Sequence, residues 1–480
     1  MKGKVGFTED KMALLVGSLI FVLSGFNILG VDLLGWAVKS NTWLSLDKML
    51  SASTGAYKSL PGIASLLITY VAITGILAWA VKLLRGDVGK FIKGFTIVFF
   101  VSYLCFAAGH YAYIAVTPDK LAKAGIPWSL GLTGEAGFIL ALLAGIFVGN
   151  FMPGLSEQLK EACRPEMFVK IAIVIMGAEL GVKAADAMGL ASSIIFRGLC
   201  AIVEAYLIYW TVVYYVSRKY FKFSREWAAP LASGISICGV SAAIATGGAI
   251  RARPVVPIMV SSLVVVFTCV EMLILPFVAA WFLHGEPMVA GGWMGLAVKS
   301  DGGAVASGAI ADALIRAKAL SVDGLKYQEG WVVMVTTTVK VFIDVFIGLW
   351  SFVLAWLWCA KIECKEGQRM SFGEVWQRFP RFVLGYILTF LLLLIVCTQS
   401  AEGMGMGKTM VGALGSLRRV FFVLTFFTIG VVSNFKKLME EGIGKLTTVY
   451  VVCLFGFIIW VGLFISWLFF HGMLPPIATA

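Results

Sequence analysis

Charged residues are scarce in this 480-residue sequence, in which Asp, Glu, Lys and Arg together make up 14%. A soluble protein carries roughly a quarter charged residues, so a soluble enzyme with a conventional polar surface is excluded. The low charge and the hydrophobic content of 60% also exclude an intrinsically disordered chain. The hydrophobic residues fall in blocks of about twenty, the length that a helix needs to cross a bilayer. The predicted fold class is therefore an all-α polytopic membrane protein.

Histidines and paired cysteines are also rare. The three histidines, His110, His284 and His471, are scattered along the chain, and the nine cysteines include no CxxC spacing. A multi-histidine metal site, a structural zinc site and a disulfide framework are therefore not expected. We expect neither a metal nor a cofactor.

Two segments resemble enzyme motifs, but each lacks a required glycine. The segment Gly403–Thr409 resembles a phosphate-binding loop, but Glu402 stands at the first glycine position. The nucleophile-elbow pattern around Ser236 fails because Cys238 replaces the second glycine. Clustered His, Asp or Glu, which a membrane-embedded enzyme would need, are also lacking, so we expect no enzyme activity.

Lys and Arg form short clusters between apolar blocks, which argues against nucleic-acid binding.

Length and hydropathy predict about thirteen membrane-spanning helices. Residues 1–127 hold three of them and an interfacial loop or short helix at Lys39–Leu60, and residues 128–282 and 291–470 hold five each. The predicted spans are Met12–Leu34, Ile63–Leu84, Phe91–Val116, Trp128–Phe151, Met167–Met188, Ser192–Val216, Trp227–Ile250, Pro257–Phe282, Gly291–Leu314, Trp331–Cys359, Pro380–Ser400, Leu417–Asn434 and Thr447–Phe470.

The two groups of five helices suggest an inverted repeat, because an odd number of crossings turns the second group upside down, as in many secondary transporters. The fourth helix of each group carries small polar residues, at 234–241 and at 427–434. Non-helical backbone at membrane depth persists only where protein or a watery cavity satisfies it. The pattern predicts two interrupted helices around a binding site; the alternative is close helix packing through small residues. The candidate substrate-binding residues here are Ser236, Cys238, Gly239, Ser241, Gly430 and Ser433.

Several segments resemble the bacterial sulfate exporter family, which is similar in architecture to bile-acid symporters and cation/proton antiporters. They are GISICGVSAAIA (234–245), IAIVIMGAEL near Glu179, GWMGLAVKSDGGAVASG (292–308), PRFVLGY (380–386) and FTIGVVSNFKKL (427–438). The resemblance implies an inverted-repeat transporter with two crossing broken helices and a small anion as cargo. The sequence departs from the family where Lys299 and Ser300 replace a histidine and an acidic residue, and where Ile343 replaces a basic residue.

Charged residues inside apolar blocks are expensive and usually functional. Glu179 and Lys183 are four residues apart, as are Lys340 and Asp344, so each pair could form an ion pair on one helix face. Arg197 and Glu204, seven apart, are interpreted as packing residues. The remaining candidates for substrate binding or coupling are Lys299, Ser300 and Asp301.

The lysine at position 299 lies among glycines and alanines that leave room for a cavity. A lysine ammonium in a partly dry cavity attracts an anion. The alternative is a lysine that snorkels to the nearer membrane interface.

These features predict a secondary active transporter that exports a small inorganic or sulfur-containing anion, sulfate-like, across the bacterial inner membrane by alternating access. A cation-coupled carrier of organic acids is the second hypothesis, and an anion channel, which would need a continuously polar pore, is the third. The expected partners are the small anionic substrate and the lipid bilayer, and a homodimer is compatible with the prediction.

The distribution of Lys and Arg predicts the orientation, since short cytoplasmic loops carry an excess of both. The chain is expected to begin in the cytoplasm and to end on the periplasmic or extracellular side. The residues that carry this prediction are Lys82, Arg85, Lys90, Arg218, Lys219, Lys222, Arg225, Lys361, Lys365, Arg369, Arg378 and Arg381.

Overall fold

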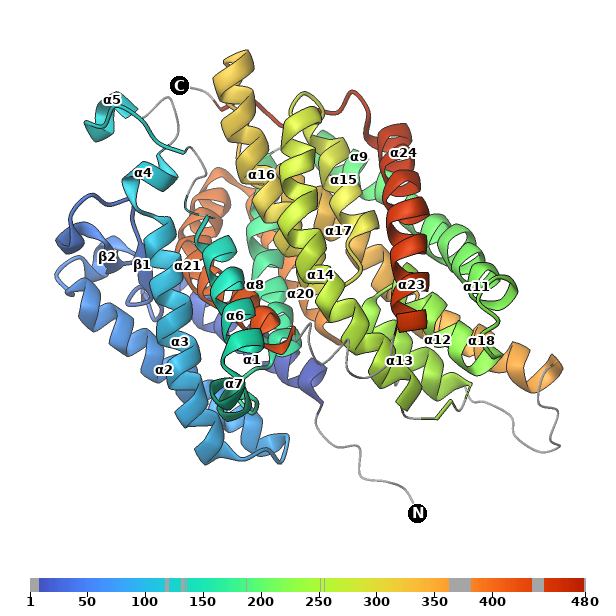
Figure 1. Ribbon diagram of the computed structural model, residues 1–480. Coiled ribbons are helices and arrows are strands. Elements are labelled where there is room, and N and C mark those ends of the chain that lie inside the picture. Colours follow the sequence, from blue (N-terminus) through green and yellow to red (C-terminus); the bar gives the residue numbers. More distant parts are fainter. Residues whose placement is uncertain are drawn as a thin grey trace. The chain divides into compact units, whose positions relative to one another are not determined.

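The computed structural model is almost entirely helical (Figure 1). It describes residues 8–116, 121–130, 134, 136–186, 188–250, 252–253, 255–361, 381–433 and 444–478. The chain divides into two compact units, each built from two separate stretches of sequence. Unit 1 comprises residues 1–191 and 381–432, and unit 2 comprises residues 192–380 and 433–480. The predicted division of the sequence into three N-terminal helices and two five-helix repeats stays a prediction.

Unit 1 is a bundle around the helix α8 (Pro165–Asp186), which packs against α1, α20 and α21. Glycines allow these helices to approach closely: a Cβ atom on Gly177 would lie 2.4 Å from the Tyr386 carbonyl oxygen of α20. The helices of unit 1 are α1 (Glu9–Gly25), α2 (Gly62–Leu83), α3 (Val88–Gly109), α4 (Ala112–Ala115), α5 (Leu121–Ala124), α6 (Ala136–Phe151), α7 (Pro153–Leu159), α8, α20 (Arg381–Gln399) and α21 (Ala401–Val432).

The segment between α1 and α2 contains a small β-hairpin, where the sequence predicted a loop or a short helix. Its strands, β1 (Val38–Ser40) and β2 (Leu50–Ala52), pair antiparallel. The hairpin is fixed to the bundle because Val38 N donates to Thr69 Oγ1 of α2 at 2.9 Å. Short helical turns flank the strands: η1 (Phe26–Leu29), η2 (Leu46–Lys48) and η3 (Gly55–Tyr57).

The N-terminal ends of α1, α8 and α20 lie together at one end of unit 1. The Arg164 guanidinium, just before α8, lies 2.7 Å from Glu9 Oε1 of α1. The Arg381 backbone N–H, at the start of α20, donates to Asp10 Oδ2 of α1. The predicted orientation puts the N-terminal ends of α1, α8 and α20 on the cytoplasmic side. Their position at the same end of unit 1 agrees with that prediction.

Unit 2 contains two helix pairs, α12 with α13 and α15 with α16, joined by the 28-residue helix α14. Two segments of π-helix, η5 and η6, interrupt other helices of this unit. Its elements are α9 (Met188–Gly198, whose first residues belong to unit 1), α10 (Cys200–Val203), η5 (Glu204–Tyr209), α11 (Trp210–Lys219), α12 (Arg225–Ser236), α13 (Gly239–Ala249), α14 (Val255–Phe282), α15 (Pro287–Ala297), α16 (Asp301–Asp323), α17 (Trp331–Val345), α18 (Ile347–Lys361), α23 (Gly444–Cys453), η6 (Leu454–Ile458) and α24 (Ile459–Phe470).

The pair α12–α13 is a re-entrant hairpin, whereas the sequence predicted one span at Trp227–Ile250. Arg253, just after α13, forms an ion pair of 3.0 Å with Glu226 in the first turn of α12. A straight helix of that length would separate these two residues by about 40 Å. The chain therefore enters unit 2, turns at Ile237 and Cys238, and returns to the end at which it entered.

The pair α15–α16 doubles back in the same way, although the sequence predicted a single span at Gly291–Leu314. His284, before α15, lies 3.6 Å from Asp323 at the end of α16. The turn falls at Val298–Ser300. Because α14 is about 42 Å long and connects the end of one hairpin to the start of the other, the two hairpins enter unit 2 from opposite ends (Figure 1).

Seven helices in the described ranges are long and apolar enough to cross a membrane, or eight if the bent pair α6–α7 is one span. The hairpin helices α12, α13 and α15 have only 12, 11 and 11 residues because the chain turns inside each predicted span, and the 23-residue helix α16 is not among the apolar candidates. If neither hairpin crosses the membrane, the predicted number of membrane-spanning helices falls from about thirteen to about eleven. That number is still odd, so the prediction of termini on opposite sides stays.

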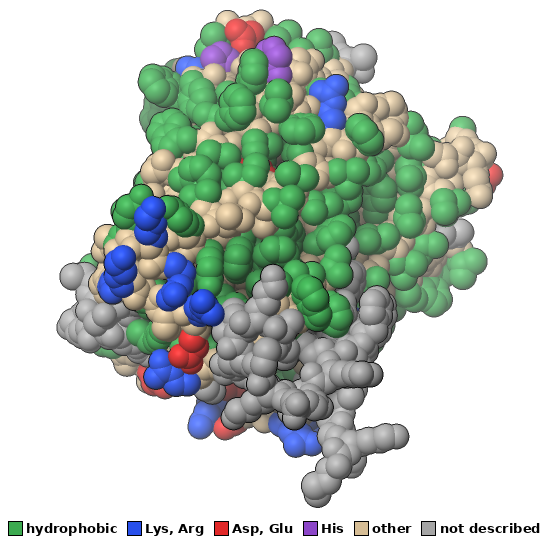
Figure 2. Space-filling model, turned by 90° about the vertical axis from the view of Figure 1, so that its right-hand side faces the viewer, with side chains coloured by type: hydrophobic (Ala, Val, Ile, Leu, Met, Phe, Trp, Pro, Cys, Tyr) green, Lys and Arg blue, Asp and Glu red, His purple; other side chains and the backbone are tan. Residues whose placement is uncertain are grey.

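The visible face in Figure 2 is largely covered by hydrophobic side chains; most of the visible Lys and Arg side chains lie toward its lower end, and the His side chains lie at its upper end. Exposed apolar side chains of unit 2 include Trp281, Trp460 and Phe464. A surface of this kind suits lipid contact, and a Lys/Arg-rich end suits the cytoplasmic side.

Reporter fusions test this orientation. A fusion after Phe223, next to Lys445, should report the cytoplasm. A fusion after Asp323 should report the opposite side, because His284 and Asp323 lie at the other end of α14. The same reporter signal at both positions would contradict the hairpin arrangement.

Candidate functional site

The tips of the two re-entrant hairpins meet inside unit 2. The backbone N–H of Gly239, the first residue of α13, donates to the Lys299 carbonyl oxygen at 2.6 Å. Both tips have extended backbone at this point, at Cys238 and at Ser300. The contact lies near the middle of α14, since a Cβ on Gly239 would meet Val264 and the Lys299 N–H donates to Glu271. Two interruptions of helix therefore coincide at about half the depth of unit 2.

Lys340 of α17 joins the two tips. Its Nζ donates to the Ile237 carbonyl at 3.0 Å and to the Val298 carbonyl at 3.3 Å. These carbonyls belong to the C-terminal ends of α12 and α15, where a helix carries partial negative charge and lacks intrahelical donors. One buried ammonium thus stabilises both helix ends.

Glu271 of α14 holds the second tip from the other side. Its Oε2 accepts from the Lys299 backbone N–H at 3.2 Å, a donor that the turn leaves without a helical partner. Its Oε1 accepts from the Tyr450 hydroxyl at 3.4 Å. The carboxylate therefore supports the backbone of the tip and is itself hydrogen-bonded.

The side chain of Lys299 is fully buried. Its Nζ donates to the Leu296 carbonyl and lies 4.5 Å from the centre of the Tyr209 ring, within cation–π range. The lysine does not extend to a membrane interface, so the snorkelling alternative does not describe this conformation.

Small polar groups complete the hairpin tips. Ser236, the last residue of α12, is fully buried, and its Oγ has no hydrogen-bond partner in the described part of the chain. Ser300 caps α16 because its Oγ accepts from the Gly303 N–H at 2.9 Å. Cys238 is buried at the first tip. Ser241 lies in the first turn of α13 and Asp301 is the first residue of α16, but their side chains lie outside the described residues.

The comparisons with known proteins give a family and leave the activity open. A profile of the family described as conserved hypothetical protein 698 matches residues 120–449. A UPF0324 membrane protein of Nitrosomonas europaea is 39% identical over 476 residues, which cover 98% of this chain and 97% of that protein. The chain belongs to the UPF0324 membrane protein family. A further member, from Nitratidesulfovibrio vulgaris, is 31% identical over 427 residues, which cover 86% of this chain and 66% of that protein. No solved structure matches the chain.

Residues 427–432 of the second small-residue segment lie in unit 1 of this UPF0324 protein. The helix α21 continues through Gly430 to Val432, so the predicted interruption is wrong for these residues. Ser433 follows the helix, and residues 434–443 lie outside the described residues. A Cβ on Gly430 would lie 2.5 Å from the Leu142 carbonyl oxygen of α6. This glycine thus permits close packing of α21 on α6, and its predicted role in substrate binding stays a prediction.

The acidic residue Glu179 forms an ion pair with a different partner from the predicted Lys183. Its Oε1 lies 3.0 Å from Arg418 Nε, so the ion pair joins α8 to α21. Spacing along a helix reveals only local partners, so this contact with α21 could not be predicted, and a pairing with Lys183 stays a prediction. The side chain of Lys183 lies outside the described residues. Asp344 is buried on α17, one turn from Lys340, and their pairing stays a prediction.

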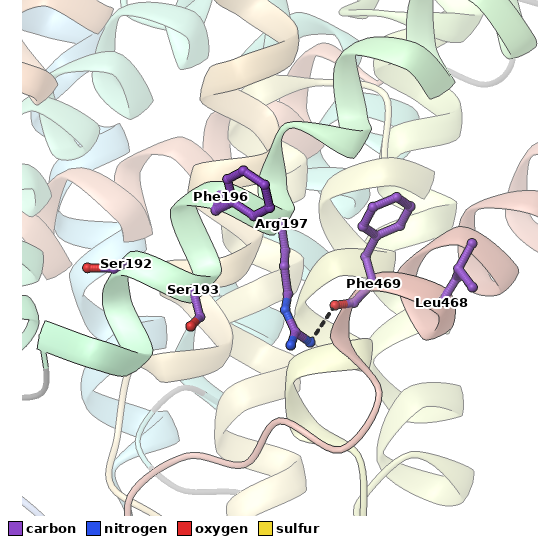
Figure 3. A pocket seen from close by; sticks show the side chains of 6 residues that line it. All are labelled: Ser192, Ser193, Phe196, Arg197, Leu468 and Phe469. Atoms are coloured by element: carbon purple, nitrogen blue, oxygen red, sulfur yellow. Dashed lines mark hydrogen bonds between the residues drawn. The ribbon is translucent and has the colours of Figure 1, made fainter.

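A groove on unit 2 contains Arg197, which the sequence analysis grouped with Glu204. The groove has a volume of about 640 Å³ and is lined by Ser192, Ser193, Phe196, Arg197, Leu468 and Phe469. Figure 3 shows Arg197 reaching from α9 to the Phe469 carbonyl oxygen, a hydrogen bond of 2.8 Å. Arg197 therefore caps the C-terminal end of α24, while Glu204 is fully buried.

Four residues around the hairpin tips were not among the predicted site residues: Glu204, Tyr209, Glu271 and Tyr450. The two glutamates carried a usable signal, because each is a charge inside an apolar block. The tyrosines carried none, since they take part only through contacts with distant segments.

Proposed function

We propose that this UPF0324 protein is a secondary active transporter for a small inorganic or sulfur-containing anion, sulfate-like, which it exports across the bacterial inner membrane by alternating access. The observation that carries the proposal is the meeting of two re-entrant tips, bridged by the Lys340 ammonium. Re-entrant backbone at membrane depth is characteristic of transporter binding sites, where it exchanges backbone hydrogen bonds for ligand contacts.

An anion is the favoured cargo because donors gather at the tips. The helices α13 and α16 begin there, and helix N-termini attract negative charge. The free hydroxyl of Ser236 can donate to an oxyanion, and Lys299 adds a positive charge. Since Ser236 and Lys299 are fully buried, an anion would reach them only after a movement of the hairpins, which supports alternating access over an open channel.

The cation-coupled carrier of organic acids remains the second candidate, because buried carboxylates accompany the lysines at the tips. The two candidate functions predict different ligands, sulfur oxyanions for the first and carboxylates for the second. Thermal-shift measurements with sulfate, sulfite, sulfonates and carboxylates should show stabilisation by the sulfur oxyanions. Stabilisation by carboxylates alone would favour the second candidate.

Substitution of Lys299 tests the site itself. Lys299→Met removes the charge and should weaken sulfate binding at least about tenfold, whereas Lys299→Arg should keep part of the affinity but disturb the geometry. The matched control is Lys219→Met, since Lys219 is exposed at the end of α11. Isothermal titration in detergent measures all three variants. Equal sulfate affinity in Lys299→Met and wild type would exclude Lys299 from the site.

A further inference from the structure

Glu204 is the most unusual buried group near the hairpin tips. Its side chain has no exposed surface, and neither carboxyl oxygen has a hydrogen-bond partner within the described residues. Glu271 provides a contrast, because both of its carboxyl oxygens accept hydrogen bonds. An ionised carboxylate without partners in an apolar interior is strongly disfavoured.

The backbone at Glu204 is also unusual. Glu204 is the first residue and Tyr209 the last residue of the π-helix η5. π-Helical turns are rare and are found frequently at functional sites. The Tyr209 hydroxyl donates to the Ile458 carbonyl of the second π-helix, η6, at 2.8 Å, so the two irregular segments are joined beside Glu204.

A glycine of α24 lets Tyr209 and Glu204 pack closely against that helix. A Cβ on Gly462 would lie 2.7 Å from the Tyr209 hydroxyl and 3.5 Å from Glu204 Oε1. Both oxygens thus border the same glycine. The Tyr209 ring in turn lies 4.5 Å from Lys299 Nζ, which connects Glu204 to the second hairpin tip.

The described ionisable groups that face Glu204 are few. Lys299 and Tyr209 interact with it electrostatically, as does Cys200 of α10. The helices α11 and α12 also pack against η5, and none of their described ionisable side chains is among the groups that interact with Glu204. Lys299 is therefore the charge that responds to ionisation of Glu204.

We infer that Glu204 carries a coupling proton: its carboxyl group is protonated while the anion is bound and ionised after the anion has left. Ionisation of Glu204 adds one negative charge beside Lys299, whose Nζ lies 4.5 Å from the Tyr209 ring. The added charge weakens the attraction of the tips for an anion and favours its release. The proton leaves to water on the side to which the hairpins open, and no bond of the anion changes.

This inference rests on the proposed function, and it makes the carrier a proton–anion symporter. One proton and one doubly charged anion that leave together carry one net negative charge outward, and a membrane potential that is negative inside favours this movement. The direction of net transport then follows from the anion gradient, the pH gradient and the potential together.

The test uses purified protein in liposomes with labelled sulfate. Exchange of labelled for unlabelled sulfate, without a pH gradient, reports the carrier alone. Accumulation driven by an acidic exterior, with an internal pH dye, reports the coupled proton. Wild type should show exchange, accumulation and acidification of the interior. Glu204→Gln, which mimics the protonated acid, should keep exchange and lose at least about 90% of the accumulation.

The control variant is Glu226→Gln, whose carboxylate is paired with Arg253 at the open end of the first hairpin and which should keep both activities. Accumulation at the wild-type level in Glu204→Gln would overturn the inference. Sulfate exchange in wild type without proton movement would also overturn it and leave the carrier proposal intact. No exchange in folded wild type would overturn the proposed function itself. The proton measurement on wild type decides the question even if Glu204→Gln fails to fold.

Discussion

Lys340→Met should destabilise unit 2 by about 1–3 kcal/mol, the range found when a buried acceptor loses its hydrogen-bond donor. The lysine donates to two carbonyls, of Ile237 and Val298, at the ends of different helices. Without it these acceptors lose a donor in the protein interior, and the repulsion between two helix C-termini is no longer compensated. Denaturant unfolding in detergent, followed by tryptophan fluorescence, measures the change.

The matched variant for this prediction is Lys219→Met, which removes an exposed lysine and should alter stability by less than about 0.5 kcal/mol. Lys340→Arg keeps a positive charge and should retain part of the stability. Equal unfolding midpoints for Lys340→Met and Lys219→Met would mean that Lys340 does not hold the tips together.

Gly239→Val should abolish transport. A Cβ at this position would lie 2.0 Å from Cγ1 of Val264, far closer than two carbon atoms can approach. Either the first tip or α14 must move, and the hydrogen bond from Gly239 to Lys299 then breaks. Overpacking of this kind typically costs 1–3 kcal/mol, so the protein should still reach the membrane in reduced amount.

The control for this steric argument lies on the same helix. A Cβ on Gly248 of α13 would have no neighbour within 4 Å, so Gly248→Val should transport normally. The milder variant Gly239→Ala should be partly rescued by Val264→Ala, which removes the methyl groups nearest to the new Cβ. Full sulfate exchange in Gly239→Val would show that close packing at the tip is not required.

The sequence was informative where a single helix carries the signal. The predicted span Ile63–Leu84 matches α2 (Gly62–Leu83) because its hydropathy is continuous and Pro61 precedes its first turn. The break at Ile237 and Cys238 was also predicted, from small polar residues in an apolar block. Local composition therefore located both the regular helix and the first irregular backbone.

The features that were missed depend on contacts between distant segments. Hydropathy cannot tell that the chain turns back after Cys238, because the evidence is the ion pair between Glu226 and Arg253, which lie 27 residues apart. The turn at Val298–Ser300 was hidden in a segment of Gly and Ala with the length of a span. Its supporting groups, Lys340 and Glu271, come from other helices.

Sulfate counterflow in proteoliposomes tests most directly whether the meeting hairpin tips form the anion site of a carrier. Liposomes that contain only the purified protein are loaded with unlabelled sulfate, the membrane potential is clamped, and labelled sulfate is added outside. We expect transient accumulation of label inside, which a channel cannot produce; it should be unchanged in Lys219→Met and lost in Lys299→Met. An absence of accumulation with folded wild-type protein, or equal accumulation in Lys299→Met, would contradict this expectation.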